Sequence, residues 1–89
     1  IYGVELGKRV PLSRGHFEIG RSSKNDLTLD EDAVSRHHAR IVCEAEGYKV
    51  LDLDSTNGVF VNDEKVRTAL LADGDQIRIG RTILKFMTG

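Results

Sequence analysis

Hydrophobic and polar residues alternate with a period of two along most of the chain, in short segments that glycine, serine, asparagine and aspartate separate. This alternation is typical of β-strands with one buried face, whereas a helix repeats its hydrophobic residues every three to four positions. The pattern predicts about nine strands, in the segments YGVEL, KRVPL, HFEIG, DLTLD, HARIVCEA, YKVLDL, VFVN, QIRIG and TILKF.

Short strands at regular spacing are typical of an antiparallel sandwich. We therefore predict an all-β fold, an antiparallel β-sandwich of about 9 to 11 short strands. Because the two sheets use their apolar faces to pack on each other, we expect the binding residues on the loops at one end. The segment 66–75, VRTALLADGD, allows at most about a turn and a half of helix before Asp73-Gly74 breaks it, so a loop or a single turn is expected there.

The length of 89 residues allows one domain and one core, which we expect to span residues 1–89. The chain begins at Ile1 without an initiator methionine, which favours a module excised from a longer protein. Its 13 basic and 14 acidic residues lack the excess of positive charge that general nucleic-acid binding needs. No apolar run approaches the roughly 20 residues of a membrane span. We therefore expect neither a nucleic-acid nor a membrane partner.

The chain contains one cysteine, Cys43, which cannot form an internal disulfide. Small secreted domains usually need such bonds, so a reducing, cytoplasmic location is favoured. In the strand HARIVCEA the alternation places Cys43 on the same face as Ala39 and Ile41. We therefore expect Cys43 to be a small buried core residue and not a reactive thiol.

The segment VSRHHARI, residues 34–41, carries a hydroxyl, a fixed positive charge and two histidines. A serine nucleophile needs a base in reach, but Ser35 lacks the glycines that frame a nucleophile elbow. A metal site is equally disfavoured, since His37 and His38 are neighbours whose side chains point to opposite faces of a strand. Taken alone, the segment is most simply a turn with solvated side chains before a strand.

Three loop motifs change this interpretation when they are set beside each other: Gly20-Arg21, the Ser35 to His38 segment, and Ser55-Thr56-Asn57-Gly58. Loops that converge at one end of a sandwich would bring a guanidinium, hydroxyls and an amide together. Arginine and hydroxyl donors suit a phosphate dianion. The set contains neither a general base nor a metal site, so we expect a non-catalytic phosphate reader that uses no cofactor.

In this order, with DGDQIRIG and a closing strand after them, the motifs Gly-Arg, Ser-Arg-His-His and STNGVFVN resemble the forkhead-associated (FHA) domain, a phosphothreonine-binding β-sandwich. The resemblance covers nearly the whole chain. Gly-Arg alone is a weak signal, because it recurs at Gly80-Arg81, but the ordered triple is specific.

The resemblance implies a role for each matching position. Arg21 would clamp the phosphate, Ser35 would donate its hydroxyl to a phosphate oxygen, and Arg36 would add a backbone N–H. Thr56 would line the phosphothreonine recess, and Asn57 would bind the peptide main chain just beyond the phosphorylated residue. These five positions are the expected phosphopeptide-binding residues.

Four further positions match architectural residues of the family. Gly20 would allow a tight approach of its loop, and His38 would brace the loop from behind without touching the phosphate. Gly58 and Asn62 would shape the neighbouring turns. Ser35 and His38 are therefore not expected to form a catalytic couple.

The implied function is to recruit a parent signalling protein to a partner phosphorylated by a Ser/Thr kinase, or to bind a phosphorylated segment of that same parent. A phosphate-independent interaction module with a vestigial phosphate site is the alternative, and a hydrolase or metalloenzyme is a more distant one. One departure from the family pattern bears on the fold: Asp63 stands where a glycine is common, which puts the turn at Asn62-Asp63 in question. Separately, the acidic run 30–32 is expected to be a solvated rim.

Overall fold

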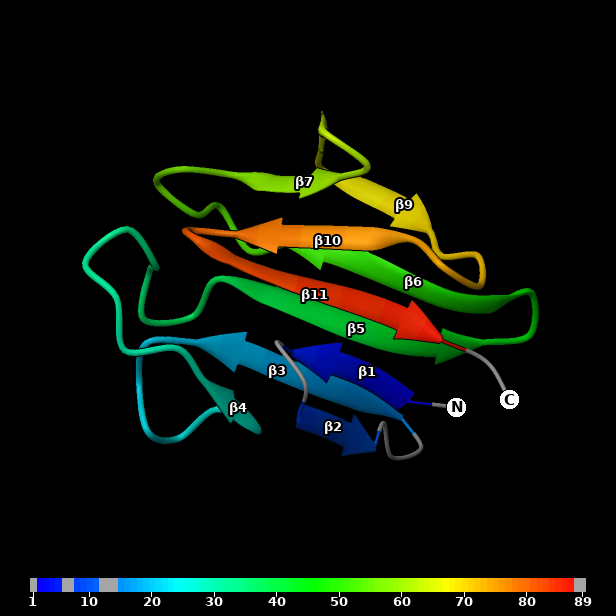
Figure 1. Cartoon of the computed structure of the whole chain (residues 1–89), viewed down its shortest axis with the longest axis horizontal. Helices are drawn as coiled ribbons and strands as arrows, with labels where there is room; N and C mark the ends of the chain where they lie inside the picture. Colours follow the sequence, from blue (N-terminus) through cyan, green and yellow to red (C-terminus); the bar gives the residue numbers. More distant parts are fainter. Residues whose placement is uncertain (1, 6–7, 12–14, 88–89) are drawn as a thin grey trace.

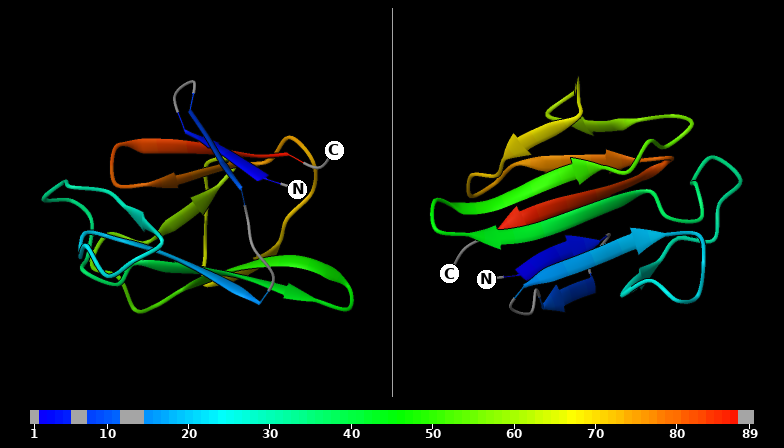
Figure 2. Two further views of the ribbon diagram at one scale, coloured as in Figure 1. Left: turned by 90° about the horizontal axis from the view of Figure 1, so that it is seen from below. Right: turned by 180° about the vertical axis from the view of Figure 1, so that it is seen from behind.

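A computed structural model describes residues 2–5, 8–11 and 15–87 of the chain. It contains eleven strands in two sheets that face each other, which confirms the predicted all-β sandwich (Figures 1 and 2). The strands are β1 (Tyr2–Glu5), β2 (Lys8–Pro11), β3 (His16–Gly20), β4 (Leu27–Thr28), β5 (Ala39–Glu44), β6 (Gly47–Asp52), β7 (Val59–Val61), β8 (Glu64–Val66), β9 (Thr68–Leu70), β10 (Gln76–Ile79) and β11 (Thr82–Met87).

One sheet has six strands in the order β2-β1-β11-β10-β7-β8, and the other has five in the order β4-β3-β5-β6-β9. Every strand pair is antiparallel except β3 with β4, which is parallel. The strands β8 and β9 follow each other in the chain but belong to different sheets, so the chain crosses between the layers at Arg67.

The core lies between the two sheets, where the inward side of each strand is apolar. In β10 and β11, for example, Ile77, Ile79, Leu84 and Phe86 are buried while the residues between them face outward. Among residues 15–87, the buried apolar residues of this layer are Phe17, Ile19, Leu29, Val34, Ala39, Ile41, Val50, Val59, Val61, Ile77, Ile79, Leu84 and Phe86. Because these side chains occupy the space between the sheets, the loops are left to carry the function.

The prediction of a loop or a single turn for residues 66–75 holds for residues 71–75 but is wrong for Val66 and for Thr68–Leu70. Thr68–Leu70 forms the edge strand β9, which pairs with β6 through Leu51↔Thr68, Val50↔Ala69 and Lys49↔Leu70. The strand β8 was not predicted either. Neither β8 nor β9 has a buried residue, whereas β7 of the same length buries Val59 and Val61. Pairing with a neighbouring strand therefore decides the conformation of β8 and β9.

Cys43 is exposed, which corrects the expectation of a buried core thiol. The alternation along β5 does hold as far as Ile41, but the last residues of the strand are exposed. The backbone N–H of Cys43 donates to the carbonyl of Gly15 at 2.9 Å. Periodicity tells which face of a strand a residue occupies but not whether another element covers it.

The turn between β7 and β8 forms without the glycine that is common at position 63. Asn62 and Asp63 have φ values of +50° and +69°, and Val61 pairs directly with Glu64, as in a two-residue type I′ hairpin. Asn and Asp tolerate this left-handed conformation better than other residues that have a side chain. The side chain of Asn62 also bonds the backbone N–H of Gln76 at 3.0 Å, which attaches the hairpin to β10.

Candidate functional site

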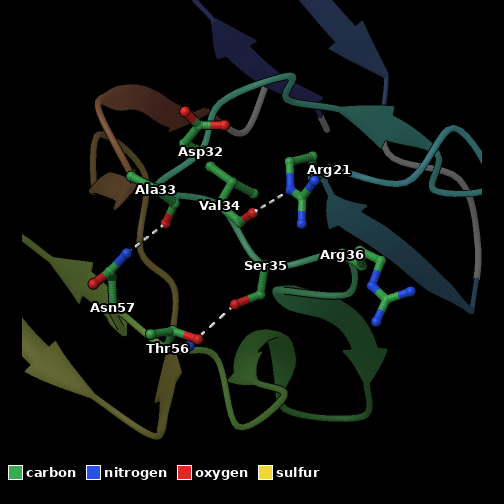
Figure 3. Close-up of a pocket in the computed structure, with 8 residues that line it drawn as sticks. All are labelled: Arg21, Asp32, Ala33, Val34, Ser35, Arg36, Thr56 and Asn57. Carbon is green, nitrogen blue, oxygen red and sulfur yellow. Dashed lines mark hydrogen bonds between the residues drawn. The ribbon is translucent and has the colours of Figure 1, made fainter.

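One pocket of about 320 Å³ lies at the end of the sandwich where three loops meet. The loops follow β3, precede β5 and connect β6 to β7, and they contain the three motifs that the sequence singled out. Figure 3 shows Ser35 between two guanidinium groups on one side and Thr56 and Asn57 on the other. The lining residues are Arg21, Asp32, Ala33, Val34, Ser35, Arg36, Thr56 and Asn57.

Arg21 is the first residue after β3, and two hydrogen bonds fix it in place. Its backbone N–H donates to the carbonyl of Ser35 at 3.0 Å, and its Nε donates to the carbonyl of Val34 at 3.0 Å (Figure 3). The Nε bond orients the guanidinium plane and leaves the two terminal amino groups for a ligand. A fixed fork of this kind matches two oxygens of a phosphate or carboxylate.

Gly20 lies directly against the loop that carries Arg36. A Cβ at this position would stand 2.2 Å from the carbonyl oxygen of Arg36, so only glycine allows the two backbones to approach this closely. The same carbonyl accepts a hydrogen bond from the side-chain amide of buried Asn25 at 2.7 Å, and that amide also donates to the carbonyl of Ser22 at 2.8 Å. Asn25 thus connects the loop after β3 to the loop before β5. From the sequence, Asn25 was expected only to be a residue of a turn.

We expect Gly20→Ala to destabilise the domain by about 1 to 3 kcal/mol, because the added methyl forces a backbone carbonyl to move. The displaced Arg36 loop should also weaken ligand binding. Urea denaturation and calorimetric titration measure the two effects. Gly15→Ala is the control for affinity: Gly15 lies at the opposite end of β3, where its φ of +90° makes an alanine costly to stability, but a Cβ there would meet nothing within 4 Å. Loss of affinity in Gly15→Ala, or full affinity in Gly20→Ala, would contradict this account.

Ser35 lies at the centre of the pocket, and its hydroxyl group remains free to donate a hydrogen bond to a ligand. The hydroxyl oxygen accepts a hydrogen bond from the backbone N–H of Thr56 at 3.0 Å (Figure 3). The hydroxyl hydrogen is therefore directed away from that bond and can donate to an anion. The backbone N–H of Ser35 is already used, because it donates to Nδ1 of His38 at 3.0 Å.

His38 is fully buried, with 0% of its surface exposed, and both ring nitrogens are hydrogen-bonded. Since Nδ1 accepts from Ser35, Nε2 carries the hydrogen and donates to the carbonyl of Gly58 at 2.8 Å. The neutral ring thereby links the Ser35 loop to the β6–β7 loop. Its Nδ1 is bonded to the backbone of Ser35 and not to the hydroxyl, which is the geometry of a brace and not of a general base.

Thr56 and Asn57 form the side of the pocket opposite the arginines, and both are exposed. The side-chain amide of Asn57 donates to the carbonyl of Ala33 at 2.8 Å, so it connects the two loops across the pocket. Its oxygen and second N–H stay available to an extended chain. Gly58 follows with a φ of +88°, and its N–H donates to the hydroxyl of Ser55 at 3.0 Å.

The acidic run 30–32 is only partly the solvated rim that was expected. Asp30 and Asp32 are exposed, and Asp32 lines the pocket, but Glu31 attaches the loop to the β10–β11 turn. Its carboxylate accepts hydrogen bonds from the Thr82 hydroxyl and, at 2.8 Å, from the Arg81 backbone N–H. The hydroxyl of Thr82 chiefly, and then the N–H of Arg81, hold the pKa of Glu31 below its ordinary value of 4.5.

A pKa that is lowered in the folded state adds stability above the unfolded value, and this stability is lost as the pH falls through the folded value. We therefore expect Glu31→Gln to be less stable than the parent domain at neutral pH, and the difference to shrink as the pH falls below the ordinary pKa of 4.5. Urea denaturation at neutral pH and at several pH values below 4.5 checks this. Asp30→Asn, at an exposed neighbour, is the control. A difference that stays constant with pH would show that the charge of Glu31 does not matter.

Asn62 does not line the pocket. It lies at the opposite end of β7 from Gly58, where its side chain bonds Gln76 and, at 3.0 Å, the carboxylate of Asp75. Within residues 2–5, 8–11 and 15–87, no group of three His, Cys, Asp or Glu side chains could hold a metal ion. The same residues contain no helical segment with the length and apolar character that a membrane span requires.

A β-sandwich that gathers a fixed arginine, a hydroxyl donor and an amide at one loop end belongs to the class of anion-recognition modules. The family model of the FHA domain matches residues 17–80, which include every motif at the pocket. The chain therefore belongs to the FHA domain family, as the sequence motifs predicted.

Curated relatives support the same assignment. The glycogen accumulation regulator GarA of Mycolicibacterium smegmatis is 40% identical over 87 residues, which are 98% of this chain and 55% of that protein. The transcriptional regulatory protein EmbR of Mycobacterium tuberculosis is 45% identical over 80 residues, which are 89% of this chain and 21% of that protein. The chain thus spans about half the length of the GarA proteins it matches, and less of EmbR.

Solved structures agree in fold. A structure from a structural and functional analysis of phosphothreonine-dependent FHA domain interactions has a TM-score of 0.92 at 32% identity, covering 99% of this chain and 95% of the other. Mycobacterium tuberculosis EmbR in complex with a low-affinity phosphopeptide has a TM-score of 0.90 at 41% identity, covering 97% of this chain and 24% of the other.

Proposed function

We propose that this FHA domain binds a phosphothreonine-containing segment of a protein in the pocket at the loop end. The observation that carries the proposal is the convergence of Arg21, Ser35 and Arg36 on one pocket. The two free amino groups of Arg21 donate hydrogen bonds to two phosphate oxygens, and the Ser35 hydroxyl donates to the third. Arg36 offers its exposed guanidinium and its backbone N–H, for which none of the described residues supplies a hydrogen-bond acceptor.

The peptide lies extended across the loops, from the arginine side of the pocket toward Thr56 and Asn57. Asn57 offers its free oxygen and second N–H to the main chain beyond the phosphorylated residue, and the Ala33 bond holds it in position for that contact. Thr56 lines the recess for the threonine methyl group. One phosphate with a few flanking contacts gives micromolar affinity, about 8 kcal/mol.

Binding is the whole activity of the domain, which is not an enzyme and needs no cofactor. The nitrogen of His38 that could act as a base is bonded to the Ser35 backbone, so no base is in place to activate the Ser35 hydroxyl. The alternative is a phosphate-independent interaction module with a vestigial anion site. The orientation of the Arg21 guanidinium argues against this alternative. A site that no longer binds an anion would not require an exposed arginine whose Nε is held by a backbone carbonyl.

The parent protein is recruited to partners that a Ser/Thr kinase has phosphorylated, or the domain binds a phosphorylated segment of the parent chain itself. The exposed free thiol of Cys43 fits a reducing, cytoplasmic location. Recognition involves neither nucleic acid nor membrane, since the chain has a net charge of −1.

Titration with a degenerate phosphothreonine peptide library, beside unphosphorylated and phosphoserine versions, tests the proposal. We expect binding to the phosphothreonine library alone in the micromolar range, and phosphoserine peptides to bind about 5- to 150-fold more weakly, because a buried methyl group contributes about 1 to 3 kcal/mol. Binding that is indifferent to phosphate would favour the alternative. Equal affinity for the two phosphoamino acids would remove the role assigned to Thr56.

A further inference from the structure

The outer face of the six-stranded sheet lies away from the loop pocket and is turned toward the viewer in Figure 1. In β7, β10 and β11 the residues next to the buried positions point outward, and the register places them side by side. Phe60 pairs with Lys65 and Arg78, Arg78 also pairs with Ile83, and Gln76 pairs with Lys85. We call these six residues the basic face: Phe60, Lys65, Gln76, Arg78, Ile83 and Lys85.

All charges on the basic face have the same sign. Lys65, Arg78 and Lys85 are cations, and none of the three makes a salt bridge with a described carboxylate. The outer face of the five-stranded sheet differs, because there Glu18 pairs with Arg40 and Glu44 pairs with Lys49 at 3.0 Å. Since the whole chain has a net charge of −1, the unpaired positive charge is a local feature of one sheet.

The centre of the basic face is apolar. Ile83 is 44% exposed, one of two large hydrophobic side chains so exposed among the described residues. Arg78 lies across from it on β10 and Lys85 two positions along β11. The guanidinium of Arg78 is stacked over the ring of Phe60 at 4.2 Å, so it is held on the sheet and not free in solvent. An exposed aliphatic centre with a charged rim is the usual composition of a protein interface.

We infer that the basic face is a second docking surface, for an acidic segment of a protein partner that places an apolar side chain on Ile83 between Arg78 and Lys85. Charge complementarity selects the partner, because three unpaired cations attract a carboxylate-rich surface. An apolar centre disfavours nucleic acid, whose backbone would have to cross Ile83. A single exposed aliphatic side chain gives too little apolar area for insertion into a membrane. The surface is separate from the loop pocket, so both can be occupied at once.

The test is an NMR titration of the labelled domain with a short synthetic peptide of Glu and Asp that carries one central Leu. We expect saturable amide shifts at Arg78, Ile83 and Lys85, and about tenfold weaker binding when the Leu is replaced by Ser. A short DNA duplex and vesicles of phosphatidylglycerol and phosphatidylcholine are the competing probes. The inference is overturned if no saturable shifts occur on the basic face, if only DNA or vesicles produce them, or if the peptide shifts only the Arg21 and Arg36 loops.

Variants separate this surface from the phosphopeptide pocket. The double variant Arg78→Gln with Lys85→Glu should weaken acidic-peptide binding by about tenfold or more, while Arg67→Glu, at an exposed arginine elsewhere, should not. Lys65 is left unchanged because its side chain lies against Gly58. Phosphothreonine-peptide affinity should stay within about twofold in the double variant, since distant sites act independently. Acidic-peptide binding that survives the double variant would refute the assignment, whatever the phosphopeptide titration gives.

Discussion

Arg21→Ala is expected to weaken phosphothreonine-peptide binding by at least about 30-fold, and more if the phosphate is left without another partner. Removing one side of a desolvated charge pair costs about 2 to 5 kcal/mol. The variant should fold normally, because Arg21 is exposed and its backbone bond to Ser35 does not need the side chain. Calorimetric titration with a phosphothreonine peptide and a thermal melt of the same sample measure the two quantities.

Arg21→Lys refines this test. A lysine ammonium keeps the charge but cannot donate to the Val34 carbonyl and present two parallel donors at the same time. We therefore expect Arg21→Lys to recover only a minor part of the lost affinity, whereas Arg67→Ala, at an exposed arginine outside the pocket, should bind like the parent domain. Full recovery in Arg21→Lys would show that only charge matters, and an unchanged affinity in Arg21→Ala would remove the pocket from the proposed function.

The sequence predicts the strands that carry two buried apolar residues, even three-residue β7, and misses β8 and β9, which have no buried residue, for a physical reason. HFEIG became β3, and QIRIG and TILKF became β10 and β11 with boundaries that differ by one residue at most. Each of these strands has at least two inward apolar residues, so the buried face defines the strand. β8 and β9 have three residues each, and β9 is fixed by its hydrogen bonds to β6, which no local pattern reveals.

In the pocket, too, the sequence predicted one group of residues and missed another. The motif residues Arg21, Ser35 and Asn57 come together as the order of the motifs predicted. The contacts that hold the loops were not predicted, because they join side chains to backbone groups far apart in the chain. Asn25 donates to Arg36, and Glu31 accepts from Arg81. Both residues looked like ordinary loop residues, and only the three-dimensional approach of a carbonyl or an N–H gives each a partner.

His38→Ala should have the largest effect on stability, a loss of about 3 to 5 kcal/mol. The substitution leaves a cavity, and it removes the partners of the Ser35 N–H and the Gly58 carbonyl, each of which costs about 1 to 3 kcal/mol when it is buried and unpaired. For a domain of this size the melting temperature should fall by about 15 to 25 °C. Thermal and urea denaturation give both values. A fall of only a few degrees would mean that the loops hold together without the ring.

Two amide variants test the two hydrogen bonds of the His38 ring separately. In His38→Asn the side-chain oxygen stands near the place of Nδ1 and can accept from Ser35, but nothing reaches Gly58. In His38→Gln the longer amide reaches the place of Nε2 and can donate to Gly58, but Ser35 loses its acceptor. If the brace acts on binding through Ser35, phosphopeptide affinity measured below the melting transition should be higher in His38→Asn than in His38→Gln, even where their stabilities are equal. The reverse order would show that the Gly58 side of the ring positions the ligand, and equal affinities would limit His38 to stability.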